Sequence, residues 1–313
     1  MQLINNKWRF LKLTKEKTRN KLFNLLGDLP PNDFKVSSEL IQKEEKNDFF
    51  IEKLKLDLNG IEPVPAFFIS PKNINGPNPV ILFNHSHGGN YEIGKEELLN
   101  SAPYMYKKSY AKDLTEKGFS ILCIDAWGFG ERRGRTETEI FKEMLWKGQV
   151  MWGMMVFDNI KAIDYLTTRD DVNEKRIGTL GMSMGSTMAW WVSALDERIK
   201  VCVDICCMTD FKTLIEYGGL DKHSVNYFVP NLINHFSTSE INALISPRPH
   251  LSLNGIYDQL TPEKGLDIIN ENLKKVYRNV GVEERFKLKK YAVAHLETSE
   301  MRIEVLKFLE KWL

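Results

Sequence analysis

The chain has 313 residues, of which 42% are hydrophobic and 27% are charged, so it can bury a substantial core and its composition excludes a disordered chain. Lys and Arg number 43 and Asp and Glu 42, which gives a net charge of +1. This near-neutral balance gives no global reason to expect binding to nucleic acid or to an anionic membrane.

No segment of the sequence predicts export or a membrane span. The most apolar run, residues 150–157, is far shorter than the roughly 20 residues that a spanning helix needs. Residues 1–27 contain neither a continuous apolar segment nor a small-residue cleavage site. We therefore expect a cytoplasmic protein with reduced thiols. Its four cysteines lack the spacing of a metal site or a disulfide scaffold, so we expect them to be buried: Cys123, Cys202, Cys206 and Cys207.

The first part of the chain differs in pattern from the rest. Apolar residues such as Leu3, Trp8 and Leu22 lie among lysines and asparagines, which predicts one or two amphipathic helices. Gly27 and the following Pro30-Pro31 pair end them. We therefore predict an N-terminal helical extension over residues 1–48 and a catalytic domain over residues 49–313. The extension could be a domain cap, a lid or a dimer arm.

From residue 49 onward the pattern predicts an α/β fold. Residues 49–58 alternate apolar and polar side chains, and Asn59-Gly60 is a hairpin turn signal before a further strand over 61–70. Short apolar runs then alternate with helical segments, which is typical of βαβ units and a mainly parallel sheet covered by helices on both faces. The expected strands cover 79–84, 119–125, 176–181, 201–207, 250–255 and 286–291, and the expected helices cover 98–117, 156–168, 184–195, 263–279 and 299–313.

The sharpest chemical signal is the sequence GMSMG at residues 181–185. It fits G-x-S-x-G and lies between an apolar strand and an apolar helix, which is the context that a nucleophile elbow requires. A tight turn there would hold Ser183 above the sheet, and glycines at 181 and 185 leave space for that turn. The alternative is a plain glycine-rich turn, but the flanking elements favour a nucleophilic serine.

A serine nucleophile needs a base and an acid, which follow it in the order Ser, Asp, His in this architecture. His295 follows the last expected strand and is the predicted base. Asp258 follows the preceding strand and is the predicted acid, which would hold the imidazole in the required tautomer. Asp258 could instead be a turn residue. Asp210 is the second candidate acid, and Asp267 is less suitable because it lies within an expected helix.

The sequence also predicts an oxyanion hole. One donor is the backbone N–H of Met184, directly after the nucleophile. The other is expected in the HSHGG loop at residues 85–89, with the N–H of His87 as the candidate. His85 and His87 could instead bind a metal, but no third ligand lies nearby in the sequence. We therefore predict no metal site and no organic cofactor.

The loop over residues 125–134 contains glycines but does not predict a nucleotide site. A dinucleotide fingerprint needs a third glycine at the position of Arg133. Trp127 and Arg132 are instead candidate substrate-binding residues, because ligands bind at the carboxyl ends of the strands in open α/β sheets. The arginines of this loop could contact an acidic group of the substrate or remain solvated.

Two stretches are candidate substrate covers. One, over about 131–157, is rich in methionine and tryptophan, which is equally consistent with a lid, core packing or an interface. The other, over about 208–247, is longer than a simple crossover. Their prominent side chains are Met144, Trp146, Met151, Trp152, Met154 and Met155 in the first and Tyr217, Tyr227, Phe228 and Phe236 in the second.

Together these residues resemble the α/β-hydrolase superfamily over residues 49–313. NHSHGGNYEIGKEEL, IDAWGFGERRG and IDYLTTRDDVNEKRIGTLGMSMG are similar to segments of dienelactone-hydrolase-like and acetyl-xylan-esterase-like proteins. The third segment also resembles the catalytic domain of prolyl oligopeptidases. The resemblance implies a triad of Ser183, Asp258 and His295, with Met184 and His87 as oxyanion donors.

The prediction is thus a cofactor-independent serine hydrolase that cleaves small-molecule carboxylic esters through an acyl-enzyme. Nucleic acid and membrane are not expected partners, and a homodimer is possible. One alternative is a small peptidase of the prolyl-oligopeptidase type, although only about 48 residues precede the catalytic domain and leave no room for a propeller. The other alternative is a catalytically idle hydrolase fold that acts as a binding protein.

Overall fold

The computed structural model describes residues 14–72 and 76–313. Within them the strands form one sheet in the order β1-β2-β3-β5-β4-β6-β7-β8-β9. Strands β1, β2, β3 and β5 pair antiparallel, whereas β5, β4 and β6 to β9 run parallel. The strands are β1 (Ser37–Glu45), β2 (Phe49–Asp57), β3 (Val64–Pro71), β4 (Asn78–Asn84), β5 (Ser120–Ile124), β6 (Val172–Met182), β7 (Ile199–Ile205), β8 (His250–Gly255) and β9 (Phe286–Tyr291).

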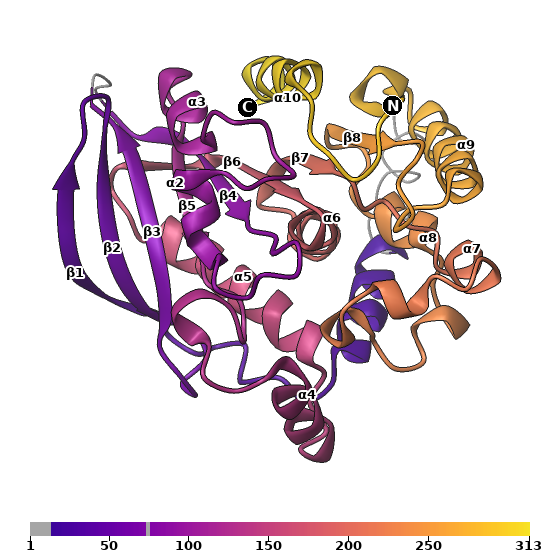
Figure 1. Ribbon diagram of the computed structural model, residues 1–313, viewed down its shortest axis with the longest axis horizontal. Helices are drawn as coiled ribbons and strands as arrows, with labels where there is room; N and C mark the ends of the chain where they lie inside the picture. Colours follow the sequence, from indigo (N-terminus) through magenta and orange to yellow (C-terminus); the bar gives the residue numbers. More distant parts are fainter. Residues whose placement is uncertain (1–13, 73–75) are drawn as a thin grey trace, which may run out of the picture.

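Helices cover both faces of the sheet, as predicted. Strand β4 shows why, because Val80 and Leu82 enter one apolar core while Ile81 and Phe83 enter the other. Helices α3 and α10 contribute to the second core, and α5, α6, α8 and α9 to the first. Figure 1 shows β1 to β3 at one end of the molecule and α7 to α9 at the other. The α-helices after residue 23 are α2 (Glu97–Asn100), α3 (Tyr110–Glu116), α4 (Glu137–Trp146), α5 (Met151–Thr167), α6 (Met184–Leu195), α7 (Phe211–Glu216), α8 (Thr238–Ala243), α9 (Glu263–Asn279) and α10 (Ser299–Trp312).

The predicted antiparallel pair is present, but the sheet extends one strand further. Strands β2 and β3 pair with Leu56 opposite Val64 on either side of the Asn59-Gly60 turn. Strand β1 pairs with β2, although the sequence places it in the helical extension. The boundary expected at residue 48 therefore falls inside a hairpin. Nearly every β1 side chain is exposed, so the strand lacks the alternating pattern that identifies a half-buried strand.

The described part of the N-terminal extension packs against the carboxyl end of α6. Residues 14–23 are helical, and the helix expected before residue 14 lies outside the described residues. The guanidinium of Arg19 donates to the carbonyl oxygens of Ala194 at 2.9 Å and Leu244 at 3.3 Å. Ala194 lies at the carboxyl end of α6, where cations favourably offset the helix dipole. This segment thus supports the carboxyl end of α6, away from the end that carries Ser183.

The helix expected over residues 98–117 is two short helices, α2 and α3. Residues 101–109 between them are not helical. Pro103 accounts for the break, because it lacks an N–H donor and disfavours helical geometry at the preceding residue. In contrast, α6 and α9 begin and end at the predicted residues. No helix among residues 14–72 and 76–313 is long and apolar enough to cross a membrane.

Candidate active site

Ser183 lies on a strained turn between β6 and α6. Its backbone has φ 56° and ψ −118°, a left-handed conformation that is uncommon for any residue except glycine. The turn is fixed on both sides, because its N–H donates to Ile205 at 2.9 Å and its carbonyl oxygen accepts from Thr187 at 3.1 Å. The half-buried Ser183 therefore has the backbone geometry that a nucleophile elbow requires.

Close packing joins this turn to the end of β4. A Cβ atom on Gly181 would lie 2.2 Å from the carbonyl oxygen of Gly185, and one on Gly185 would lie 1.9 Å from that of Asn84. Both distances are far below any van der Waals contact, so only glycine fits either position. The side chain of Asn84 is itself fixed by a 2.8 Å hydrogen bond to Thr179 Oγ1. The elbow and the loop after β4 therefore lie against each other.

The structure brings Asp258 and His295 into direct contact. Asp258 follows β8 and His295 follows β9, and the His295 Nδ1 lies 2.7 Å from Asp258 Oδ2. The Asp258 side chain is fully buried, while that of His295 is 24% exposed. The other carboxylate oxygen of Asp258 accepts from the N–H of Leu260 at 2.9 Å. These contacts orient the imidazole so that Nε2 is the ring nitrogen left for a reacting group.

The two other candidate acids have different partners. Asp210 is the N-cap of α7, where its carboxylate accepts from the N–H and the hydroxyl of Thr213. Asp267 lies on α9 and pairs with Lys290 at 2.9 Å. The hydrogen bonds of the described residues include none between Ser183 and His295, and such contacts often close only when substrate binds.

Two groups of described residues have the spacing of metal ligands, both involving cysteines that follow or lie within β7. Cys206, Asp258 and His295 present ligand atoms within 4.8 Å of one another, and Cys202, Asp204 and His250 do the same. In each group the carboxylate and imidazole already share a direct hydrogen bond, of 2.7 Å and 2.6 Å. Burial also raises the pKa of the Cys206 thiol, which opposes formation of the thiolate that a metal would bind.

The loop after β4 presents the candidate oxyanion donor. The His87 N–H donates to no described residue, while its ring nitrogen Nδ1 accepts from the N–H of Gly89 at 2.9 Å. Burial and the nearby imidazoles lower the pKa of His87 to about 4, so the side chain is neutral at neutral pH. His85 is buried and its Nε2 accepts from the N–H of Ala126 at 3.0 Å. The first N–H of α6, that of Met184, has no partner within its helix.

Trp127 and Arg132 are both buried, and their contacts are internal. The guanidinium carbon of Arg132 lies 4.3 Å from the centre of the Trp127 ring. Arg132 also pairs with Glu62 at 2.7 Å and with the buried Asp158 at 2.8 Å. These ion pairs give Arg132 a structural role that needs no substrate. The predicted substrate contact of the two residues stays a prediction.

The two predicted cover segments meet beside the elbow. Glu137, the first residue of α4, accepts from the hydroxyl of Tyr91 at 2.8 Å and from the N–H of Asn226 at 3.2 Å. The amide of Asn226 lies 3.8 Å from the sulfur of Met184. Tyr91, Glu137 and Asn226 were not candidates from the sequence, because three distant segments supply them. Tyr91 lies within the NHSHGGNYEIGKEEL segment, but nothing in that segment distinguishes it, and Glu137 and Asn226 lie in no motif.

The methionine- and tryptophan-rich stretch differs in burial between its two helices. In α5 the side chains of Trp152, Met154 and Met155 are at most 1% exposed, so this part is core. In α4 the side chain of Trp146 is 92% exposed, although Met144 of the same helix is buried, and Figure 1 shows that α4 projects away from the sheet. The role of α4 as a substrate cover stays a prediction.

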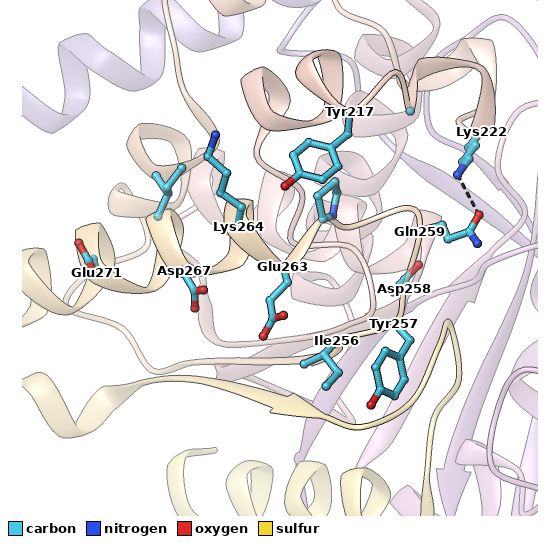
Figure 2. Close-up of a pocket in the computed structure, with 13 residues that line it drawn as sticks. Tyr217, Lys222, Ile256, Tyr257, Asp258, Gln259, Glu263, Lys264, Asp267 and Glu271 are labelled. Atoms are coloured by element: carbon cyan, nitrogen blue, oxygen red, sulfur yellow. Dashed lines mark hydrogen bonds between the residues drawn. The ribbon is translucent and has the colours of Figure 1, made fainter.

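A large open pocket lies beside the acid loop, with a volume of about 760 Å³. Figure 2 shows it between the loop that carries Asp258, the start of α9 and the ring of Tyr217. Neither Ser183 nor His295 lines this pocket. Since the Asp258 carboxylate bonds to His295, the pocket borders the candidate triad on the side of its acid.

Comparisons with known proteins agree with this architecture. A Bacillus subtilis (strain 168) protein, YtaP, whose name assigns it provisionally to the hydrolases, is 51% identical over 295 residues, covering 94% of this chain and 98% of that protein. The structure of glucuronoyl esterase from Solibacter usitatus matches with a TM-score of 0.69 at 15% identity, covering 94% of this chain and 92% of the other.

Acetyl xylan esterase 1 from Thermoanaerobacterium sp. JW/SL YS485 has a similar fold. It matches with a TM-score of 0.65 at 15% identity, covering 95% of this chain and 93% of that one. Identities this low show the shared fold. The model of the X-Pro dipeptidyl-peptidase (S15) family matches residues 64–243, which is more than half of the chain. The chain therefore belongs to the X-Pro dipeptidyl-peptidase (S15) family of α/β-hydrolases.

Proposed function

We propose that the protein is a serine hydrolase that cleaves small-molecule carboxylic esters through a Ser183–His295–Asp258 triad. The observation that carries the proposal is the 2.7 Å contact between His295 Nδ1 and Asp258 Oδ2, in a fold whose elbow holds a strained serine. Two structurally similar proteins are esterases by name, which favours esters as the substrate class. The cytoplasmic location expected from the sequence is part of the same proposal.

The first half of the reaction forms an acyl-enzyme. The Asp258 carboxylate accepts a hydrogen bond from the Nδ1–H of His295, which leaves the lone pair of Nε2 free to accept a proton. As Ser183 Oγ attacks the ester carbonyl carbon, its proton passes to Nε2. The carbonyl oxygen gains negative charge, which the N–H groups of Met184 and His87 stabilise by donating hydrogen bonds.

Collapse of the tetrahedral intermediate completes the acyl-enzyme, because the bond to the alcohol oxygen breaks and the alcohol leaves with the proton from Nε2. The second half then releases the acid. A water molecule attacks the acyl carbon while His295 takes one of its protons. When the bond to Ser183 Oγ breaks, that proton returns to the serine, and the carboxylic acid product leaves. Every proton is returned within the cycle.

Hydrolysis of peptides after an X-Pro pair is the second candidate, and the family match favours it. The same triad can cleave an amide if His295 protonates the leaving amine. A panel of esters should be compared with a panel of X-Pro amides at equal enzyme concentration. Faster hydrolysis of the esters supports our proposal, and hydrolysis of the amides alone contradicts it.

Labelling with a fluorophosphonate probe tests the triad directly. We expect a single adduct on Ser183, mapped by mass spectrometry, that is absent in Ser183→Ala and in His295→Ala. His235→Ala is the matched control, because His235 is exposed and, among the described residues, its side chain bonds only to Asn231; it should label at the wild-type rate. A folded wild-type protein that gives no adduct and no ester turnover would support the idle-fold reading.

A further inference from the structure

A buried carboxylate lies behind the candidate oxyanion loop and has no part in the reaction steps above. Glu97, the first residue of α2, is 1% exposed. Its Oε1 accepts from the backbone N–H of Ser86 at 2.9 Å, and its Oε2 accepts from the hydroxyl of Tyr104 at 2.6 Å. Ser86 directly precedes His87, so this carboxylate holds the peptide next to the predicted oxyanion donor.

Tyr104 connects the same carboxylate to the loop of the predicted base. Its carbonyl oxygen accepts from the N–H of Glu297 at 2.9 Å, two residues after His295. Its ring packs so closely on the oxyanion loop that a Cβ on Gly88 would lie 2.3 Å from it. One tyrosine therefore contacts the loop after β4 through its ring and the loop after β9 through its backbone.

The far end of this connection is rigidly anchored. Glu297 is buried, and its carboxylate accepts from Arg302 of α10 at 2.8 Å and from the N–H of Tyr106 at 3.1 Å. Arg302 also pairs with Asp113 of α3. The loop that carries His295 is thus fixed to α3 and α10. Tyr104 links this loop to Glu97 and to the oxyanion loop at residues 85–89.

We propose that Glu97 is a positioning residue. Together with Tyr104 it holds the backbone N–H of His87 at a fixed position relative to the imidazole of His295. This rests on the proposed function, because it assigns Glu97 to support that oxyanion hole. The ionised carboxylate fits this role, since both of its oxygens accept from donors that point at it. If Glu97 were protonated, one of its oxygens would still accept from the N–H of Ser86. The other would carry an O–H that faces the Tyr104 hydroxyl in place of an accepting oxygen.

The electrostatic surroundings make this carboxylate sensitive to pH. Burial raises the pKa of Glu97 to about 7, the hydrogen bonds from Tyr104 and Ser86 oppose the rise, and Glu297 adds to it. Cys123 of β5 also interacts electrostatically with Glu97. The ammonium of Lys95, on the same segment, is already paired with other carboxylates. Glu97 therefore changes charge in the neutral range.

Kinetics on Glu97→Gln test this role, with Glu96→Gln as the matched control because Glu96 is the exposed neighbour. We expect Glu97→Gln to lower kcat about tenfold with KM within about twofold, as for a weakened oxyanion site, and Glu97→Ala to lose more. As the pH falls through about 7, kcat/KM of the wild type should show the loss that follows protonation of Glu97. This component of the pH profile should be absent in Glu97→Gln. An unchanged kcat together with an unchanged pH profile would overturn the proposal.

Hydrogen–deuterium exchange separates this proposal from the proposed function, because it needs no turnover. Peptides covering residues 85–89 and 295–297 should exchange faster in Glu97→Ala and in Tyr104→Phe than in wild type, and at the wild-type rate in Glu96→Gln. Tyr104→Phe keeps the ring against Gly88 and removes only the hydroxyl. Faster exchange in the two variants, together with a wild type that hydrolyses no ester, would retain the positioning role and reject the proposed function. Unchanged exchange in an active enzyme would reject the positioning role alone.

Discussion

Gly185 packs against Asn84 so closely that a Cβ atom would lie 1.9 Å from the Asn84 carbonyl oxygen. Asn84 is the last residue of β4, and the candidate oxyanion loop begins directly after it. The same contact thus sets both the fit of α6 onto the sheet and the distance between Ser183 and the loop that carries His87.

Gly185→Ala should therefore lower both stability and activity. Overpacking of a close backbone contact typically costs about 1–3 kcal/mol, and here no flexible side chain can move aside. Urea unfolding and ester turnover measure the two effects. Gly265→Ala, in the first turn of α9, is the matched control, because its Cβ would lie 3.0 Å or more from its neighbours. Equal behaviour of the two variants would contradict the packing argument.

Asp258→Asn should reduce kcat by about four orders of magnitude, because an asparagine leaves the imidazole in the wrong tautomer. The fold should survive, since an amide fits the same space. Asp210→Asn is the control, because Asp210 caps α7 and does not contact His295. A larger loss of kcat in the Asp210 variant would show that the acid has been assigned to the wrong residue.

Arg132→Ala should destabilise the protein much more than Arg133→Ala. Removing Arg132 leaves the buried Asp158 without its cation, and breaking such a pair costs about 3–5 kcal/mol. Burial already raises the pKa of Asp158, and Arg132 opposes that rise. Arg133 is exposed. Chemical denaturation gives the stabilities, and KM for an uncharged ester tests the substrate contact predicted from the sequence.

The buried His250–Asp204 pair should make stability depend on pH in the alkaline range. Burial alone would lower the pKa of His250, but Cys202 and Asp204 raise it to about 10, above the unfolded value of 6.5. Its contribution is therefore fully present below about pH 6.5 and is lost as the pH rises toward 10. Unfolding free energies at pH 6 and pH 10 should differ less in His250→Gln than in wild type. A difference as large as that of wild type would show that His250 is not the responsible group.

The elements that carry the triad could be predicted because local chemistry specifies them. GMSMG requires a tight strand-to-helix turn, and the structure has that turn at Ser183. The order of strands places Asp258 and His295 at the same edge of the sheet, and they are hydrogen-bonded there. An edge strand such as β1 has an almost fully exposed pattern, so no periodicity distinguishes it from a loop or a polar helix.

Contacts between distant segments could not be predicted in the same way. Glu97 looks like any glutamate of a short helix until the fold buries it against Ser86 and Tyr104. Arg132 is one of three arginines in a polar loop, and only the structure shows that it pairs with Asp158. Burial decides the role of each charged side chain, and burial depends on which strands become neighbours.

The order in which the triad residues occur along the chain has a consequence for the protein during its synthesis. Ser183 is translated and can enter its turn well before the segments that supply Asp258 and His295 exist. Until β8 and β9 add to the sheet, Ser183 lacks both residues that we propose as its acid and base. The proposed hydrolytic activity therefore requires the last two strands of the sheet to be in place.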